Sequence, residues 1–273
     1  MSHVISNYAG PEDMVAADVV GARARNAMRA FEVTSPAQPA LAMRTPEAVQ
    51  PVCLPAEAPE GARHQLFADV AIGLDRTRTM LKRVGPQLAQ SGLLTALETQ
   101  SPATYDHARR VAESATALAR AMCLSGREVR EVRCAALFHD IGKIAIPSQV
   151  LDGSGPLSED ERSVLRVHVT IGAELLSDIP TLAAAAPVVM ATHERYDGGG
   201  YPWGLAGSAI PLGARIIAVA DAYDAMTGRR PYGTPLSPTE ANRELVRCAG
   251  AAFDPEVVQA WLEMVGVPAY RPE

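Results

Sequence analysis

The sequence has no stretch of about 18 apolar residues without a charge, the length that a helix needs to cross a lipid bilayer. Its first residues also lack a basic region followed by an apolar core, which an export signal would have. These two absences argue against the membrane-spanning and secreted classes. We therefore expect a cytoplasmic protein that does not engage a membrane.

An excess of positive charge is also lacking. The 273 residues include 25 basic and 31 acidic side chains, which gives a formal net charge of −6. Such a chain lacks the broad cationic field that holds a nucleic-acid polymer or an anionic membrane. We expect no nucleic-acid polymer as a partner, whereas a small, multiply charged anion can still be bound by a few local cations.

Paired cysteines are missing as well. The four cysteines show no C-x-x-C spacing, which argues against a zinc ribbon or a redox pair. Scattered cysteines in largely helical apolar patterns fit reduced, packed side chains in a cytosol. The four residues are Cys53, Cys123, Cys134 and Cys248.

Composition divides the chain into three parts. Residues 1–60 are rich in alanine and proline, and because repeated prolines break helices we expect a flexible or irregular leader, with a short helix across residues 12–31 at most. Residues 61–100 are expected to form an N-terminal helical segment. Residues 101–270 are expected to form one main domain, since a chain of this length can bury one good core.

Signals for β-strands are almost absent, and helical periodicity continues from about residue 64 to the end of the chain. Ser158 and Glu161 form a capping-box pattern at the start of one expected helix. The sequence therefore predicts an all-α fold. The expected helices span residues 64–82, 87–99, 104–123 and 127–141, and others begin near Ser158, Pro180, Pro211, Pro238 and Pro255.

The pair His139-Asp140 ends an otherwise apolar helix pattern. Burying both side chains without partners would be costly. A carboxylate has two oxygens and can bridge two cations, whereas an imidazole offers one lone pair, so the pair suits a binuclear metal site in which Asp140 is shared. A hydrogen-bonded, inert pair at a helix end is the simpler alternative.

Four histidines decide between these alternatives. His107, His139, His168 and His193 each fall on the apolar stripe of an expected helix. Asp221 lies within the most apolar expected helix, where an unpaired carboxylate would cost several kcal/mol and normally demands a cation. Together these residues predict a metal centre.

The candidate ligands follow one another in the order His107, His139 with Asp140, His168, His193 and Asp221. This order is similar to that of the HD superfamily of metal-dependent phosphohydrolases. The run Tyr-Asp-Gly-Gly-Gly-Tyr-Pro at residues 196–202 narrows the resemblance to the HD-GYP family. The resemblance covers about residues 85–270, with shorter matches at residues 146–147, 155–157, 210–216, 230–232 and 253–255.

The resemblance implies a bundle of about seven helices around a binuclear metal site, so that residues 101–270 would be an HD-GYP-like catalytic domain. It implies hydrolysis of the bacterial second messenger cyclic di-GMP to pGpG or GMP. His107, His139, Asp140 and Asp221 would hold one divalent ion. Asp140, His168 and His193 would hold the other, and a bridging hydroxide would be the nucleophile. Iron or manganese is expected, and zinc, cobalt or nickel would also suit these ligands.

Several further residues are expected to contact the substrate. Lys143 lies one turn beyond His139, where its ammonium could meet a phosphate oxygen and act with Asp140 in catalysis; a solvated lysine is the alternative. Arg230 could clamp a phosphate with its fork of donors, and a surface arginine is the alternative. The other candidates are Gly199, Gly200 and Tyr201 of the glycine-rich loop, and Asp224 beside Asp221.

Three positions depart from the family pattern. Thr192 stands where most members have a histidine, Ala103 where some have a glutamate for a third metal, and Gly233 where relatives place a basic residue. Thr192 and Ala103 favour two ions and low activity, and Gly233 removes part of the expected substrate clamp. They also motivate an alternative function, a degenerate domain that senses a cyclic dinucleotide or binds a protein. A homodimer formed through residues 64–99, or a signalling-protein partner, is a further hypothesis.

Overall fold

The computed structural model describes residues 60–85, 88–151, 157–228 and 234–267. Within these ranges the chain is helical, and its extended pairings are two isolated bridges, Asp197 with Ala206 and Ala249 with Phe253. The predicted all-α class is therefore confirmed. The expected leader, including the helix across residues 12–31, lies outside the described residues, except for residue 60.

Most described helices start within two residues of the sequence prediction, but the first starts at Glu60 and not at residue 64, and the α-helix expected from Pro180 starts only at Ala186. Between residues 101 and 270, the described α-helices outnumber the seven expected of the bundle, partly because predicted helices are interrupted. The α-helices are α2 (Glu60–Val84), α3 (Ala89–Gln100), α4 (Pro102–Ala121), α5 (Gly126–Phe138), α6 (Ser148–Leu151), α7 (Glu159–Arg166), α8 (His168–Ser177), α9 (Ala186–Met190), α10 (Leu212–Thr227), α11 (Pro238–Arg247) and α12 (Pro255–Met264). Short 3-10 turns cover Ile141–Ala145, Ala183–Ala185 and Gly207–Ala209.

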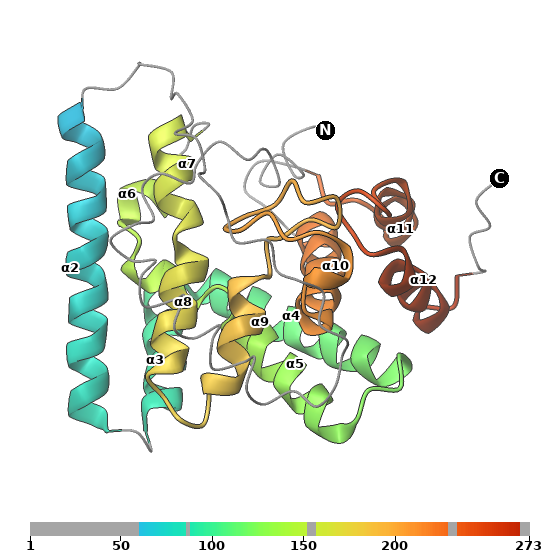
Figure 1. Ribbon diagram of the computed structural model, residues 1–273, viewed down its shortest axis with the longest axis horizontal. Helices are drawn as coiled ribbons and strands as arrows, with labels where there is room; N and C mark the ends of the chain where they lie inside the picture. The colour runs from blue at the N-terminus through green and yellow to red at the C-terminus, as the bar shows by residue number, and fades with distance from the viewer. Residues whose placement is uncertain (1–59, 86–87, 152–156, 229–233, 268–273) are drawn as a thin grey trace.

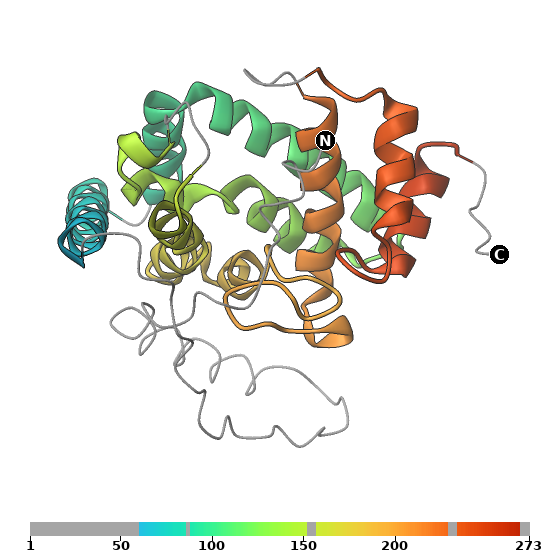
Figure 2. The ribbon, with the colours of Figure 1, turned by 90° about the horizontal axis from the view of Figure 1, so that it is seen from above.

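The bundle is built around α4, α5 and α10, which pack against one another. In Figure 1, α2 stands at one side, α11 and α12 stand at the other, and α8, α9 and α10 lie between them. The view from above in Figure 2 keeps α2 and α12 at opposite ends. No described helix combines the length and the apolar character that a membrane span requires.

The long helix α2 packs on its own chain. It contacts the 3-10 turn Ile141–Ala145, and Arg78 Nη2 donates to Glu174 Oε2 of α8 at 2.8 Å. Its apolar residues Val70, Leu74 and Leu81 are buried in the main core. The apolar stripe predicted across residues 64–82 is therefore used within the chain.

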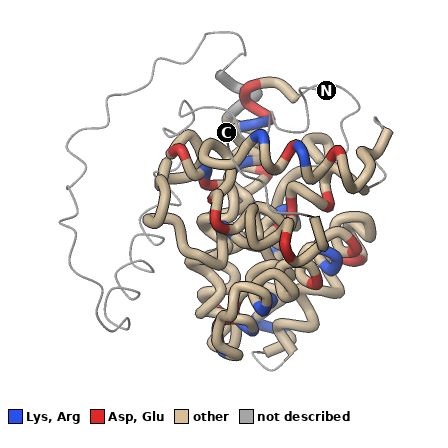
Figure 3. Tube along the Cα trace, turned by 90° about the vertical axis from the view of Figure 1, so that its right-hand side faces the viewer, with Lys and Arg blue, Asp and Glu red and all other residues tan. Residues whose placement is uncertain are grey.

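In the view of Figure 3, basic and acidic positions are interspersed along the described helices.

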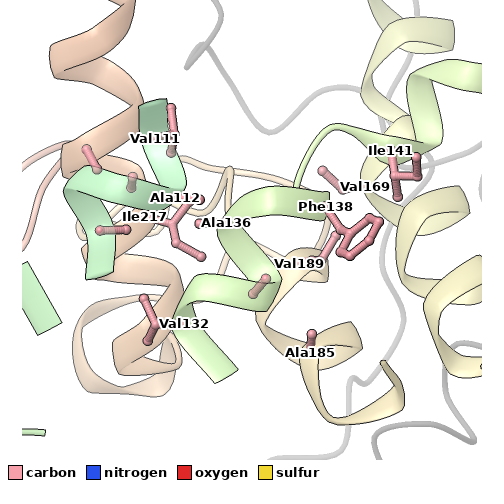
Figure 4. Close-up of a cluster of buried hydrophobic side chains, with 14 of the residues drawn as sticks. Val111, Ala112, Val132, Ala136, Phe138, Ile141, Val169, Ala185, Val189 and Ile217 are labelled. Carbon is pink, nitrogen blue, oxygen red and sulfur yellow. The ribbon is translucent and has the colours of Figure 1, made fainter. Parts of the chain in front are cut away.

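A buried apolar cluster lies on both sides of α5 (Figure 4). Phe138, the last residue of α5, is fully buried and faces α8 and α9. Because His139 follows Phe138 directly, this packing anchors the chain at the start of the His-Asp pair. The labelled members of the cluster are Val111, Ala112, Val132, Ala136, Phe138, Ile141, Val169, Ala185, Val189 and Ile217.

Three predicted helices end earlier or are broken. The helix expected across residues 127–141 ends at Phe138, and Asp140 leads into a 3-10 turn. The helix with the confirmed Ser158–Glu161 capping box is interrupted at Val167, so that His168 begins a new helix. The expectation that His193 lies on the stripe of a helix is wrong, since α9 ends at Met190.

Backbone hydrogen bonds explain the early end of α9. The amides of Ala191 and Thr192 bond three residues back, to Val188 and Val189, instead of four. The Thr192 hydroxyl also donates to the Val189 carbonyl at 2.8 Å. Bonds of this type tighten and end a helix. His193 therefore lies in a turn, where its ring direction is set by packing and not by helical period.

A close backbone contact brings Asp140 to α8. A β-carbon at Gly142 would lie 1.9 Å from the carbonyl oxygen of His168 and 2.7 Å from the backbone nitrogen of Gly172. Only glycine fits this position without displacing backbone. The 3-10 turn can therefore lie directly on the first turn of α8.

A buried ion pair joins α10 to the start of α12. Arg215 donates through Nε to the Ile210 carbonyl at 3.0 Å and through Nη1 to Asp254. Asp254, whose side chain is 1% exposed, also accepts the Glu256 amide at 2.9 Å and so caps α12. The sequence matches at residues 210–216 and 253–255 thus meet in one contact.

We expect Gly142→Ala to lower the free energy of unfolding by at least about 2 kcal/mol, because the new methyl group overlaps the His168 carbonyl. Urea denaturation measures the change. Gly92→Ala in α3 is the matched control, since its β-carbon would meet Val84 Cγ2 at 3.6 Å and Met80 Sδ at 3.7 Å. It should be neutral or stabilising by up to about 1 kcal/mol. Equal effects of the two substitutions would contradict the packing argument.

Candidate metal centre

The structure brings the predicted metal ligands together from five segments, which are the interiors of α4 and α10, the end of α5, the start of α8 and the turn after α9. Two overlapping groups have ligand atoms within 4.8 Å of one another. Asp140 is the residue common to both groups, as expected for a shared carboxylate. The groups are His107, His139 and Asp140, and Asp140, His168 and His193.

Asp221 joins the first group. Its Oδ1 lies 3.0 Å from His107 Nε2 and 4.0 Å from His139 Nε2. His139 Nε2 is in turn 3.5 Å from Asp140 Oδ2. Four side chains from α4, α10 and the end of α5 therefore surround one point.

The imidazoles of His139 and His168 are oriented by backbone carbonyls. Nδ1 of His139 lies 2.8 Å from the Ala136 carbonyl oxygen, and Nδ1 of His168 lies 2.6 Å from that of Leu165. A carbonyl oxygen only accepts, so each Nδ1 carries the proton. Each Nε2 then presents its lone pair to the centre, which is the arrangement found in metal-ligating histidines.

In the second group, the Nε2 lone pair of His168 faces Asp140 Oδ1, which is also an acceptor. His168 Nε2 lies 3.3 Å from Asp140 Oδ1 and 3.2 Å from His193 Nε2. Asp140 Oδ1 is buried and accepts no hydrogen bond from the described residues. A buried oxygen that faces a nitrogen lone pair is unfavourable unless a cation lies between them. The residues therefore fit a metal ion.

The pKa shifts show where the centre holds positive charge. Burial disfavours the charged form of His107, but its hydrogen bonds to Asp221 and Asp224 outweigh this and raise its pKa to about 10. Burial and the neighbouring His168 lower the pKa of His193 to about 3. Asp140 shows the opposite balance, since Lys143 and the histidines overcome burial and hold its pKa well below the usual range.

These shifts suit metal binding. The carboxylates of Asp221 and Asp224 favour a positive charge at His107, either a proton or a metal ion. His193 stays neutral, which is the form that ligates metals. The donor set contains nitrogen and oxygen without thiolate, so iron, manganese, zinc, cobalt and nickel all suit it.

Asp224 lies behind His107. Its Oδ2 accepts from His107 Nδ1 at 2.7 Å, and Arg110 holds both carboxylate oxygens, at 2.7 and 3.0 Å. Asp224 therefore orients the His107 ring, and its contact with the substrate stays a prediction. Sequence reasoning missed Arg110; its place three residues after His107, on the same helix face, was the available signal.

Lys143 lies at the edge of the centre. Its Nζ is 2.6 Å from Asp140 Oδ2, and its side chain is 28% exposed. The solvated lysine that the sequence allowed is therefore replaced by an ion pair with the shared carboxylate. Arg230, the other cation expected to contact phosphate, lies outside the described residues, as does Gly233.

Glu194 organises the loop that follows His193. Its buried carboxylate accepts the amides of Trp203 at 2.8 Å and Leu205 at 3.0 Å. Burial raises the pKa of Glu194 to about 7, although these amides oppose the shift. Sequence reasoning did not include this residue in the site. Its position directly after His193 and four residues before the glycine-rich run was the signal.

The glycine-rich loop is folded against itself. Gly198 has a positive φ of 83°, as the sequence allowed. A β-carbon at Gly200 would lie 2.3 Å from the Arg195 amide nitrogen, so the predicted close approach is made to the loop's own backbone. The amide of Gly199 donates to Asp197 at 2.9 Å. Contact of Gly199 and Gly200 with a substrate stays a prediction.

Tyr201 is the loop residue that reaches the centre. Its ring stacks on the imidazole of His193, with centroids 5.1 Å apart and planes inclined by 10°. Its backbone amide donates to the His193 carbonyl at 3.1 Å. Tyr201 therefore covers one candidate ligand and fixes the loop beside it.

The sequence profile of the family described as HD domain matches residues 93–257. Among curated proteins, the chain is 42% identical over 163 residues to a cyclic di-GMP phosphodiesterase of Thermotoga maritima, covering 59% of this chain and 44% of that protein. It is 44% identical over 174 residues to the cyclic di-GMP phosphodiesterase response regulator RpfG of Xanthomonas campestris, covering 63% and 46%. The chain thus spans less than half the length of either relative.

Two solved structures share the fold. A cyclic GMP-AMP specific phosphodiesterase of V. cholerae has a TM-score of 0.50 at 23% identity, over 64% of this chain and 47% of that one. An HDG"Y"P protein from Bdellovibrio bacteriovorus has a TM-score of 0.50 at 17% identity, over 96% and 76%. The chain belongs to the HD-domain family, and the predicted HD-GYP resemblance is confirmed.

We expect Asp224→Ala to weaken the binding of Mn²⁺ by roughly 10- to 100-fold, since the ring of His107 loses the carboxylate that orients it. Competition titration against a chelator measures the affinity. Asp75→Ala is the control, because it removes an exposed carboxylate from α2. Unchanged Mn²⁺ affinity in Asp224→Ala would refute the orienting role.

We expect Glu194→Gln to lower the free energy of unfolding by about 1–3 kcal/mol. The NH2 group of the glutamine side chain cannot accept a hydrogen bond, so one of the two backbone N–H groups that Glu194 binds would lose its acceptor. Chemical denaturation measures the loss. Glu98→Gln, at an exposed position of α3, serves as the control and should change little. Equal stability of both variants would show that the buried carboxylate is dispensable to the loop.

Proposed function

We propose that this chain is a metal-dependent phosphodiesterase that hydrolyses cyclic di-GMP to pGpG or GMP. The observation that carries the proposal is the buried carboxylate of Asp140, whose two oxygens face separate groups of histidines. The names of the relatives in Thermotoga maritima and Xanthomonas campestris support the reaction and its substrate.

Two divalent ions, iron or manganese by the family resemblance, would supply an acidified water and stabilise the charge that develops on the phosphate. His107, His139 and Asp221 would hold one ion together with Asp140. His168 and His193 would hold the other, also together with Asp140. The carbonyls of Ala136 and Leu165 keep the rings of His139 and His168 aimed inward.

Lys143 supplies the cation nearest to the reacting phosphate. One of its three N–H donors is engaged with Asp140 Oδ2 at 2.6 Å, and the ammonium is partly exposed. The remaining donors can bind a non-bridging phosphate oxygen. Tyr201 excludes water from one side of His193 by stacking on it.

The substrate class is a cyclic dinucleotide. Relatives named for cyclic di-GMP are 42% and 44% identical, whereas one named 3'3'-cGAMP-specific phosphodiesterase 2, from Vibrio cholerae, is 34% identical. This difference favours cyclic di-GMP. A signalling role in the cytoplasm, a catalytic domain beginning near residue 101, and a homodimer or signalling-protein partner stay predictions.

The test compares the shared carboxylate with the lysine beside it. His139→Ala and Asp140→Asn should lose bound metal and abolish hydrolysis, because both groups of ligands depend on this doublet. Lys143→Ala should keep the metal and slow turnover by roughly 100-fold, as loss of one donor to the transition state does.

Elemental analysis gives the metal content, and chromatography of the nucleotides with added Mn²⁺ or Fe²⁺ gives turnover. Full activity in the His139 and Asp140 variants would overturn the proposal. Tight binding of metal and cyclic di-GMP by the unaltered chain without any product would instead identify the sensor alternative.

A further inference from the structure

A pocket adjoins the second group of candidate ligands. It contains three cationic side chains and, among the described residues that line it, no carboxylate. Its inner end is formed by two imidazoles of the metal centre. The lining residues are Lys143, Arg162, Leu165, Arg166, His168, His193 and Tyr201.

Two of the cations come from one face of α7. Arg162 and Arg166 are four residues apart, so their side chains lie on successive turns of the helix. The helix is tied to the metal centre, because the Leu165 carbonyl binds His168 Nδ1 at 2.6 Å. The helix that carries both arginines therefore has a fixed position relative to the candidate ligands.

Arg166 is held in place by the loop. Its guanidinium carbon lies 5.3 Å from the centroid of the Tyr201 ring, and this ring stacks on His193. Burial lowers the pKa of Arg166, yet a guanidinium stays charged at neutral pH. A half-buried cation binds an anion more strongly than an exposed one does, because water screens it less.

Arg162 lies nearer to solvent. Its ion pair with Glu159 is 3.3 Å long, with side chains 41% and 49% exposed. Such a surface pair contributes little, so an anionic ligand can replace it. Exposure thus rises along the pocket, from His168 at 2% through Lys143 at 28% to Arg162 at 41%.

This gradient matches the shape of a cyclic dinucleotide, which carries two phosphodiester groups on opposite sides of one ring. When one phosphodiester lies at the imidazoles and Lys143, the other must lie farther out. We propose that Arg162 and Arg166 bind this second, non-scissile phosphodiester of the substrate. The proposal rests on the proposed function and adds the residues that would select a cyclic dinucleotide over a simple phosphodiester.

The experiment compares two substrates in Arg162→Gln, Arg166→Gln and the double variant. For cyclic di-GMP, KM should rise at least about 10-fold with each substitution, as expected for loss of a charged hydrogen bond, and kcat should fall much less. Bis(p-nitrophenyl) phosphate has a single phosphodiester, so its kcat/KM should change far less than that of cyclic di-GMP.

Arg127→Gln is the matched control, since Arg127 also pairs with a glutamate on its own helix but lies at the start of α5, remote from His139. It should leave KM for cyclic di-GMP unchanged. Arg166→Lys keeps the charge and should restore part of the loss, which separates charge from packing on Tyr201. The metal content of every variant should equal that of the unaltered chain.

Equal losses for both substrates, or an unchanged KM for cyclic di-GMP, would overturn the role of the two arginines while leaving the proposed function intact. An unaltered chain that hydrolyses neither substrate would contradict the proposed function. Calorimetric titration with cyclic di-GMP then tests the arginines by binding alone: an at least 10-fold weaker Kd in the variants supports their role, and an equal Kd refutes it.

Discussion

The carboxylate of Asp140 is almost fully buried, and each of its oxygens therefore requires positive charge nearby. Lys143 lies on Oδ2, whereas Oδ1 faces the Nε2 lone pair of His168. Most of the geometry around the centre follows from this requirement. The Ala136 carbonyl orients the ring of His139 towards the centre, and the carboxylates of Asp221 and Asp224 favour a positive charge at His107. A cluster of this kind fits a metal ion.

The fold meets the requirement with helix ends. Phe138 is anchored in the core, so the chain must leave α5 at His139, and the carbonyls near that end are free to bind the ring. Gly142 then allows the next turn to lie on the first turn of α8, where His168 begins. Helix termini position His139 and His168, whereas His107, Asp221 and Asp224 come from the interiors of α4 and α10.

A second chain of contacts connects the centre to its surroundings. The carboxylate of Glu194 holds the loop by accepting two backbone amides. The loop in turn stacks the ring of Tyr201 on His193, and the guanidinium of Arg166 in α7 lies over the Tyr201 ring. The glycine-rich run is therefore part of the wall of the centre. Its glycines allow the loop backbone to pack closely on itself. This packing gives a short irregular segment a fixed shape beside the candidate ligands.

The sequence by itself determined the all-α class, most helix starts and the identity of the candidate ligands, because capping boxes, prolines and apolar period are local signals and because buried histidines and acids need a partner. Only the tertiary structure decided where helices end, as at Met190, and which side chains meet. Arg110 pairs with Asp224, 114 residues away, and Arg215 pairs with Asp254, 39 residues away. Glu194 accepts the amides of Trp203 and Leu205 within its own loop. Local patterns can mark such residues as candidates, but the choice of partner depends on how the helices pack and the loop folds.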